Sequence, residues 1–194
     1  MSTLIQNTRR GKARIGDSGL AARLRRELEG DVLFDQFSRG QYSTDASIYQ
    51  IEPIGIVVPR TDEDVISAID IAREEGVPVL PRGGGTSQCG QTVGEALIID
   101  TSKSLNRILK FDSATGIVTV QPGLVLDQLN RFLRPHGVFF PIDPSTASRA
   151  TLGGMTANNS CGGRSIKYGL TVNNVHAIEA VLADGTQHRF ADVP

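Results

Sequence analysis

Several features that the sequence lacks narrow the range of possible functions. Tryptophan is absent, aromatic residues make up 5%, and two cysteines, Cys89 and Cys161, occur in 194 residues. Two cysteines are too few for a disulfide framework or for a zinc or iron–sulfur site built from cysteine alone. Three scattered histidines without paired carboxylates do not make a metal site either. A cytoplasmic protein without a bound metal is therefore the expectation.

Long hydrophobic runs and charge of one sign are also lacking. No apolar stretch approaches the ~20 residues that cross a bilayer, and residues 1–14 have no hydrophobic core of the signal-peptide kind. The 20 basic residues nearly balance the 21 acidic ones, for a net charge of −1. A nucleic-acid partner would require a basic face, so none is expected. Glycine is in excess: 21 of the 194 residues are glycine, about 11% of the chain against a usual share of about 7%.

The first part of the chain divides into a leader, a helix and a polar stretch. Residues 1–16 show no periodicity and are interpreted as a mobile leader, whereas residues 17–30 carry leucines at helical spacing after a capping aspartate. Residues 31–49 are polar and are expected to be irregular. We therefore expect a leader with a helix over residues 1–40 and a separate domain over residues 41–194.

The pattern sharpens from residue 54 onward. A β-branched run over residues 54–59 predicts a buried strand. The spacing of Thr61 and Asp64 predicts a capped helix that ends at Gly76, and residues 77–81 form another expected strand. A strand, helix and strand in this order favour parallel strands with a covering helix.

Later elements are expected to be richer in β-strands. Residues 96–100 and 117–121 are predicted strands, residues 126–133 fit a helix that ends before a proline, and residues 175–190 fit a hairpin. The whole pattern predicts an α+β architecture in two lobes, in which a smaller βαβ lobe precedes a larger lobe with a mixed or antiparallel sheet.

The first glycine cluster follows an expected strand directly. Gly83, Gly84 and Gly85 are followed by Thr86 and Ser87. A glycine-rich loop at the end of a strand lets the backbone approach a ligand, and its N–H groups can form an anion-binding nest. Gly84, the middle glycine, is expected to need either a positive φ or close approach by the ligand. A β-branched residue there is expected to abolish cofactor binding without unfolding the chain.

Two familiar phosphate-binding patterns fail at this loop. Gly85, Gly90 and Thr92 have the spacing of a P-loop, but Gln91 stands where that loop has its lysine. The dinucleotide pattern fails because Gln88 stands at the third glycine position. These departures disfavour an ATPase and a Rossmann domain, and leave a neutral nest suited to a pyrophosphate diester.

The second glycine cluster lies within residues 141–163, which hold few large apolar side chains and many small donors. Such a segment is not expected to fold alone. Laid along an extended polar ligand, its amides and hydroxyls would find partners.

Together with residues 42–47, Pro122-Gly123 and residues 182–185, these segments resemble the flavin half of the FAD-linked oxidases of the vanillyl-alcohol oxidase and p-cresol methylhydroxylase type. The resemblance covers residues 42–190 and is nearest to the D-lactate, glycolate and D-2-hydroxyglutarate dehydrogenases. It implies that residues 41–194 form a PCMH-type FAD-binding domain with FAD between two lobes. Some relatives attach the flavin to a histidine in the first glycine loop. Thr86 stands at that place here, which implies noncovalent binding.

The resemblance also implies a set of residues that contact the cofactor. Those for the pyrophosphate are Gly83, Gly84, Gly85, Thr86 and Ser87. Those for the rest of FAD are Pro144, Ser145, Thr151, Gly153, Gly154, Asn158, Gly162, Gly163 and, through its backbone at the adenine end, Ile178.

The expected activity is oxidation of a D-2-hydroxy acid by hydride transfer to flavin N5, with FAD supplying the redox chemistry. In the family a second domain carries the substrate-binding and proton-abstracting residues. This domain is not expected within the 194 residues, so no catalytic residue is assigned and this chain alone is expected to be inactive. Two alternatives remain. One is the flavin domain of an enzyme like the UDP-N-acetylenolpyruvoylglucosamine reductases, and the other is a nucleotide-binding module without turnover.

Overall fold

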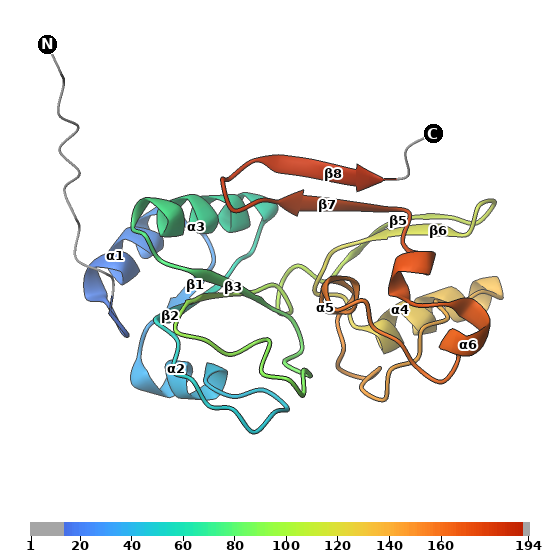
Figure 1. Ribbon diagram of the computed structural model, residues 1–194. Helices are drawn as coiled ribbons and strands as arrows, with labels where there is room; N and C mark the ends of the chain where they lie inside the picture. Colours follow the sequence, from blue (N-terminus) through green and yellow to red (C-terminus); the bar gives the residue numbers. More distant parts are fainter. Residues whose placement is uncertain (1–13, 192–194) are drawn as a thin grey trace, which may run out of the picture.

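The computed structural model describes residues 14–191, which form two lobes side by side with a hairpin across them (Figure 1). The expected α+β class and the two lobes are confirmed. Most of the predicted leader lies outside the described residues. The division of the chain into residues 1–40 and 41–194 stays a prediction. No helix among the described residues is long and apolar enough to cross a membrane.

The first lobe is built on a four-stranded sheet with the order β1-β2-β4-β3. Its strands are β1 (Asp31–Leu33), β2 (Gly55–Val58), β3 (Val79–Arg82) and β4 (Leu97–Asp100). β4 runs parallel to both β2 and β3 and separates them, whereas β1 pairs antiparallel with β2. The parallel arrangement expected for the strand–helix–strand unit is therefore confirmed, with β4 inserted at its centre.

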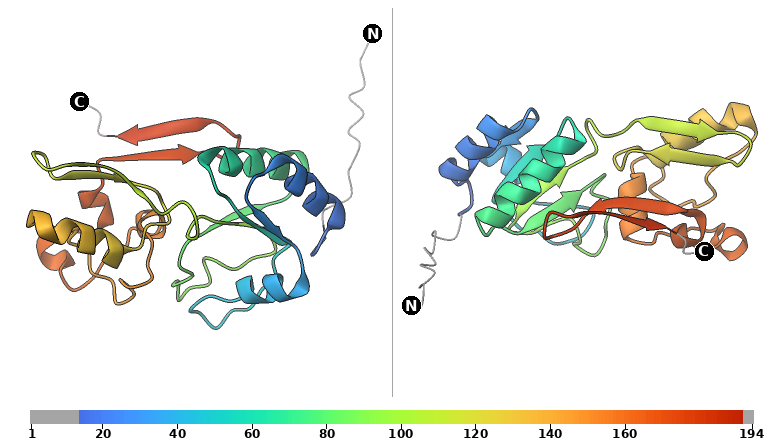
Figure 2. Two further views of the ribbon diagram at one scale, coloured as in Figure 1. Left: turned by 180° about the vertical axis from the view of Figure 1, so that it is seen from behind. Right: turned by 90° about the horizontal axis from the view of Figure 1, so that it is seen from above.

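Three helices cover the two faces of this sheet. α1 (Ser18–Glu27) and α3 (Asp62–Glu74) lie on one face, and α2 (Gln36–Tyr42) lies on the other (Figures 1 and 2). Asp17 caps α1 through the N–H groups of residues 19 and 20, and Thr61 caps α3 through the N–H of Asp64. Both predicted helices are thus confirmed. The expectation that residues 31–49 are irregular is wrong, because β1 and α2 lie there.

The central strands explain why this lobe folds around them. Every residue of β2 and of β4 is buried. Val57, Leu97 and Ile99 pack beneath α1 and α3, while Ile56 and Ile98 face α2. Strands that are covered on both faces need continuous apolar runs, and the sequence supplies such runs here.

The second lobe has smaller ladders. β5 (Ile108–Asp112) and β6 (Ile117–Val120) form one antiparallel pair, which packs on α4 (Leu126–Leu133). The sheet expected to dominate this lobe is divided into two separate two-stranded ladders. Phe111 and Phe132 meet edge to face beside His136, in a 3-10 turn (Arg134–His136) that ends at Gly137.

Residues 141–163, which were expected to find hydrogen-bond partners along an extended ligand, contain one short helix. This helix is α5 (Leu152–Ala157), and α6 (Ser165–Tyr168) and a 3-10 turn (Thr171–Asn174) follow it in the chain. Leu152 and Met155 enter the core formed by α4, which anchors α5 in spite of its two glycines. Ile142 and Ala150 are buried in the same core, so four apolar residues pack residues 141–163 against α4. That the segment does not fold alone stays a prediction.

The predicted hairpin is confirmed as β7 (Ala177–Val181) and β8 (Gln187–Ala191). It leaves the second lobe and crosses above the first, and its turn reaches α3 (Figures 1 and 2). Gly185 in this turn has a φ of +85°, and a Cβ there would lie 2.6 Å from the Oδ1 atom of Asp70. The hairpin therefore links the two lobes on one side.

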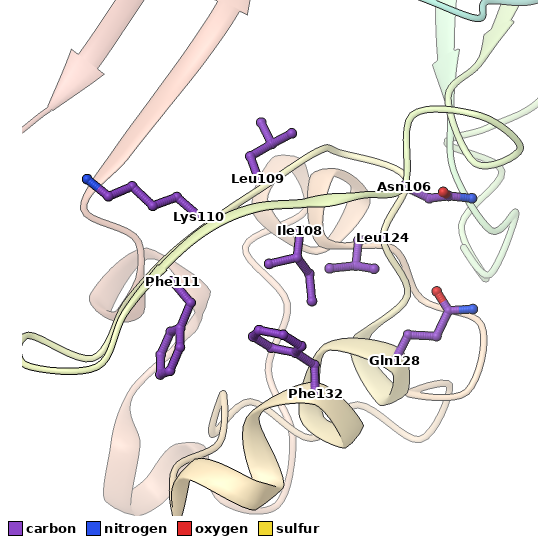
Figure 3. A pocket seen from close by; sticks show the side chains of 8 residues that line it. All are labelled: Asn106, Ile108, Leu109, Lys110, Phe111, Leu124, Gln128 and Phe132. Atoms are coloured by element: carbon purple, nitrogen blue, oxygen red, sulfur yellow. The ribbon is translucent and has the colours of Figure 1, made fainter.

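A shallow groove of about 350 Å³ lies between β5 and α4 (Figure 3). Its lining residues are Asn106, Ile108, Leu109, Lys110, Phe111, Leu124, Gln128 and Phe132. None of them belongs to either glycine cluster, so this groove is separate from the predicted cofactor site.

Candidate functional site

The first glycine cluster forms a loop that starts where β3 ends. Gly85 has a φ of +63°, which is the left-handed conformation that glycine adopts readily. Its carbonyl accepts a hydrogen bond from the N–H of Ala46 at 3.2 Å. Within residues 14–191, the N–H groups of residues 84–87 donate to no protein acceptor. A turn with free N–H groups around a left-handed glycine is the kind of backbone that binds anions.

The side chain of Arg82 supports this loop from inside. The guanidinium group of Arg82 donates to the carbonyl oxygens of Tyr42, Thr44 and Thr92. Burial lowers its pKa from the ordinary value, while Asp100, Tyr42 and Asp45 act in the opposite direction. Arg82 is therefore committed to protein partners.

Thr151 joins the two glycine clusters. Its side-chain hydroxyl is buried and has no hydrogen-bond partner among the described residues. A Cβ added to Gly83 would lie 2.1 Å from this oxygen, and one added to Gly154 would lie 3.2 Å from it. A buried hydroxyl without a partner is costly, so this one marks a place where a ligand can supply the missing hydrogen bond.

Gly84 also touches the second cluster, but for a different reason than expected. A Cβ there would lie 2.2 Å from the carbonyl oxygen of Arg149, and its φ is not in the left-handed region. The need for glycine therefore comes from close approach by the protein's own backbone. The expectation that a β-branched residue would leave the fold intact is corrected accordingly.

A chain of side-chain hydrogen bonds connects the far end of the loop to α5. Ser87 donates to the Oε1 atom of Gln91 at 2.9 Å, and Gln91 donates through Nε2 to the Oδ1 atom of Asn158 at 3.0 Å. Gln91, which stands where a P-loop has its lysine, thus ties the lobes together. Asn158 is engaged by the protein rather than free.

Pro144 and Ser145 follow Asp143, which forms the centre of a second group. A Cβ on Gly162 would lie 2.2 Å from the carbonyl oxygen of Asp143. The carboxylate of Asp143 accepts a hydrogen bond from the N–H of Arg164 at 2.9 Å and forms an ion pair with its guanidinium. The structure therefore brings residues 143–145 and residues 162–163 together.

Ile178 is set apart from both groups. It lies on β7 opposite Phe190 of β8, and its side chain is 39% exposed. Gly153 packs instead against Pro122, whose carbonyl accepts its N–H at 2.8 Å. Two of the implied site residues are thus placed beside elements other than the first glycine loop.

Three residues of this site were not recognised as functional from the sequence. The sequence does not predict that Arg82, Gln91 and Asp143 each hold a glycine segment in place, as they do in the structure. Only Arg82 carried a usable sign, because it is a charged residue that directly precedes the glycine run, and a charge that is drawn into a protein needs partners. Its partners, however, lie 10 to 40 residues away in sequence, and no local pattern reveals them.

Solved structures share this architecture. An alkyldihydroxyacetonephosphate synthase superposes with a TM-score of 0.78 over 90% of this chain and 34% of its own, at 23% sequence identity. A BBE-like 1 protein of Physcomitrella patens superposes with a TM-score of 0.76 over 89% of this chain and 37% of its own, at 21% identity. These matches establish the two-lobed fold.

The sequence itself matches the model of the FAD binding domain over residues 53–191, and the chain belongs to this family. It is 40% identical over 161 residues to a D-2-hydroxyglutarate dehydrogenase of Haemophilus influenzae, covering 81% of this chain and 16% of that protein. A glycolate oxidase subunit GlcD of Bacillus subtilis is 37% identical, covering 82% of this chain and 35% of the relative. The chain thus spans a minor part of these relatives.

Proposed function

We propose that this chain is the FAD-binding part of a dehydrogenase that oxidises a D-2-hydroxy acid. The proposal is supported by membership of the FAD binding domain family and by the printed names of relatives at 37–40% identity. The observation that carries it is the unpaired hydroxyl of Thr151 between the two glycine clusters. This hydroxyl supports a cofactor site at the contact between the two clusters.

The residues present fit such a cofactor. The free N–H groups of residues 84–87 would hold the pyrophosphate, since backbone donors around a left-handed glycine suit an anion of moderate charge. Thr151 would donate its hydroxyl once the backbone at Gly83 moves aside, because less than 1 Å² of the oxygen is accessible, while Gly85 would keep its place on Arg82. Residues 143–145 and 162–163 would line the remainder of the cofactor. Thr86 stands in the first glycine loop, so the attachment is proposed to be noncovalent.

The bound flavin would supply a hydride acceptor, so that the hydroxy acid leaves as a keto acid and a proton. The residues of this chain bind and orient the cofactor. Groups that bind the substrate and remove its hydroxyl proton are proposed to lie in the larger part of the relatives that this chain does not match. The electron acceptor is not assigned, and a cytoplasmic location remains part of the proposal.

A titration of the purified chain with FAD tests the proposal. Flavin fluorescence should change saturably, and FAD at 100 times its Kd should stabilise the fold by about 2.7 kcal/mol. Titration with ADP serves as the comparison. Binding of ADP without binding of FAD would contradict the proposal and favour a nucleotide-binding module. NADPH oxidation by the FAD-loaded protein would favour the reductase alternative.

A further inference from the structure

The guanidinium group of Arg82 points into the protein and donates to backbone carbonyls, whereas the N–H groups of residues 84–87 have no protein acceptor among the described residues. Its Nη2 atom donates to the carbonyl oxygen of Thr44 at 2.8 Å, and its Nη1 atom donates to those of Thr92 at 3.0 Å and Tyr42 at 3.3 Å. The guanidinium lies 5.2 Å from the centre of the Tyr42 ring. Both terminal nitrogens of its planar fork thus bond to backbone acceptors, which lie on two separate segments.

The positive charge of Arg82 is also balanced by nearby groups of the protein. Tyr42 donates its hydroxyl to the carboxylate of Asp100 at 2.6 Å, and both Asp100 and Asp45 interact electrostatically with Arg82. A Cβ on Gly85 would lie 2.6 Å from the Nη2 atom of Arg82. The left-handed glycine of the loop therefore rests directly on the guanidinium group.

The segment of residues 42–47, which we term the support segment, holds both arms of the loop. Ala46 donates its N–H to the carbonyl of Gly85 on the first arm. On the second arm, Thr92 donates its hydroxyl to the Oδ2 atom of Asp45 at 3.0 Å. Arg82 bridges the same support segment and Thr92 from inside. Two independent sets of bonds therefore define the width of the loop.

We propose that Arg82 is a positioning residue that fixes the glycine loop in its cofactor-binding shape by bonding to backbone carbonyls, without contacting the cofactor phosphates. This inference rests on the proposed function. A loop that is already held in shape loses less conformational freedom when it binds a ligand, so its affinity is higher. The fork geometry, rather than the positive charge, is what the loop requires.

The Arg82→Lys variant separates these two roles, because lysine keeps the charge but cannot reach three carbonyls in one plane. We expect its Kd for FAD to rise about tenfold, since loop preorganisation is lost. Arg39→Lys is the matched control. Arg39 is also mostly buried and donates to the carbonyl of Phe34 and to Glu52, away from the loop. Its Kd for FAD should equal that of the wild type.

Wild-type affinity in Arg82→Lys would overturn the inference, and so would equal losses of affinity in both variants, which would indicate a general loss of stability. A second variant, Arg82→Ala, leaves a space that free guanidinium can fill. Millimolar guanidinium should restore FAD binding to folded Arg82→Ala, and failure to do so would contradict the role of the carbonyl bonds. If the wild-type chain itself does not bind FAD, the proposed function fails instead.

Discussion

The two glycine clusters reach their shapes by different means. The first, at residues 83–85, is held by the side chain of the adjacent Arg82 and by the support segment, which is distant in sequence. The second, within residues 151–163, is held mostly by its own short helices and by Asp143. The first cluster leaves backbone donors free, whereas the second presents the unpaired hydroxyl of Thr151.

This difference indicates that the two lobes contribute different kinds of hydrogen-bonding group to the binding site. A loop with a left-handed glycine and free N–H groups can accept an anion only if something else keeps it open. The second cluster, whose backbone is engaged in α5 and in the contacts of Gly162 with Asp143, offers a side chain instead. The contact between them therefore joins a backbone donor surface to a hydroxyl.

The largest loss of stability is expected at the contact between the two glycine clusters. Gly84→Ala would place a Cβ 2.2 Å from the carbonyl oxygen of Arg149. Because backbone atoms must move to relieve the contact, we expect the free energy of unfolding to fall by about 2–3 kcal/mol. Chemical denaturation of the ligand-free chain measures this change.

The same substitution at Gly40 is the control. Gly40 lies in α2, and a Cβ there meets no atom within 4 Å. Gly40→Ala should therefore raise the free energy of unfolding by about 0.5–1 kcal/mol, as expected in a helix interior. Equal effects at the two positions would show that the clusters are not in contact in solution.

A smaller effect is expected at the bond between Gln91 and Asn158. Gln91→Ala and Asn158→Ala should each lower the free energy of unfolding by about 0.5–1 kcal/mol. The double variant should lose no more than either single one, because both remove the same bond. If Asn158 also lines FAD, Asn158→Ala should weaken FAD binding more than Gln91→Ala does, whereas equal losses would reduce Asn158 to a link between the lobes.

The smallest effect concerns pH and the support segment. Burial acts to raise the pKa of Asp45, but hydrogen bonds from Ser47 and Thr92 outweigh it and hold the pKa below its ordinary value. Since the folded pKa is depressed, this carboxylate stabilises the fold above the unfolded pKa of about 3.9, and the contribution disappears as pH falls through the folded value. Asp45→Asn should therefore flatten the unfolding free energy between about pH 5 and pH 2.

Asp112→Asn is the control for this measurement. The pKa of Asp112 is lowered as well, chiefly by the backbone N–H of Ala114, in the turn between β5 and β6. Both variants should alter the acid limb of stability, but only Asp45→Asn should raise the Kd for FAD. Weaker FAD binding in Asp112→Asn would argue against a specific role for the support segment.

Local patterns predicted most of the regular elements. The caps of α1 and α3 and the apolar runs of β2 and β4 depend on residues close together in sequence, and these predictions were confirmed. The strand and the helix in residues 31–42 were not predicted. β1 has one buried residue and α2 is only weakly apolar, so both elements depend on packing against β2 rather than on a local pattern.

The candidate site shows the same limit. The glycine positions were visible in the sequence, but the reason for each was not. Gly85 needs its left-handed φ, while Gly84 and Gly162 need room for carbonyl oxygens contributed by Arg149 and Asp143. Such contacts span about 20 to 65 residues of chain, and loop closure over that distance leaves no periodic trace in the sequence.

The most direct test of the account is the Thr151→Val variant, measured without and with FAD. Removing a buried hydroxyl that has no partner should stabilise the ligand-free chain by about 1 kcal/mol. The same change should weaken FAD binding about tenfold, because the ligand loses a hydrogen bond. Opposite signs of these two effects are what the account predicts. An unchanged Kd for FAD would show that the contact between the glycine clusters is not part of the cofactor site.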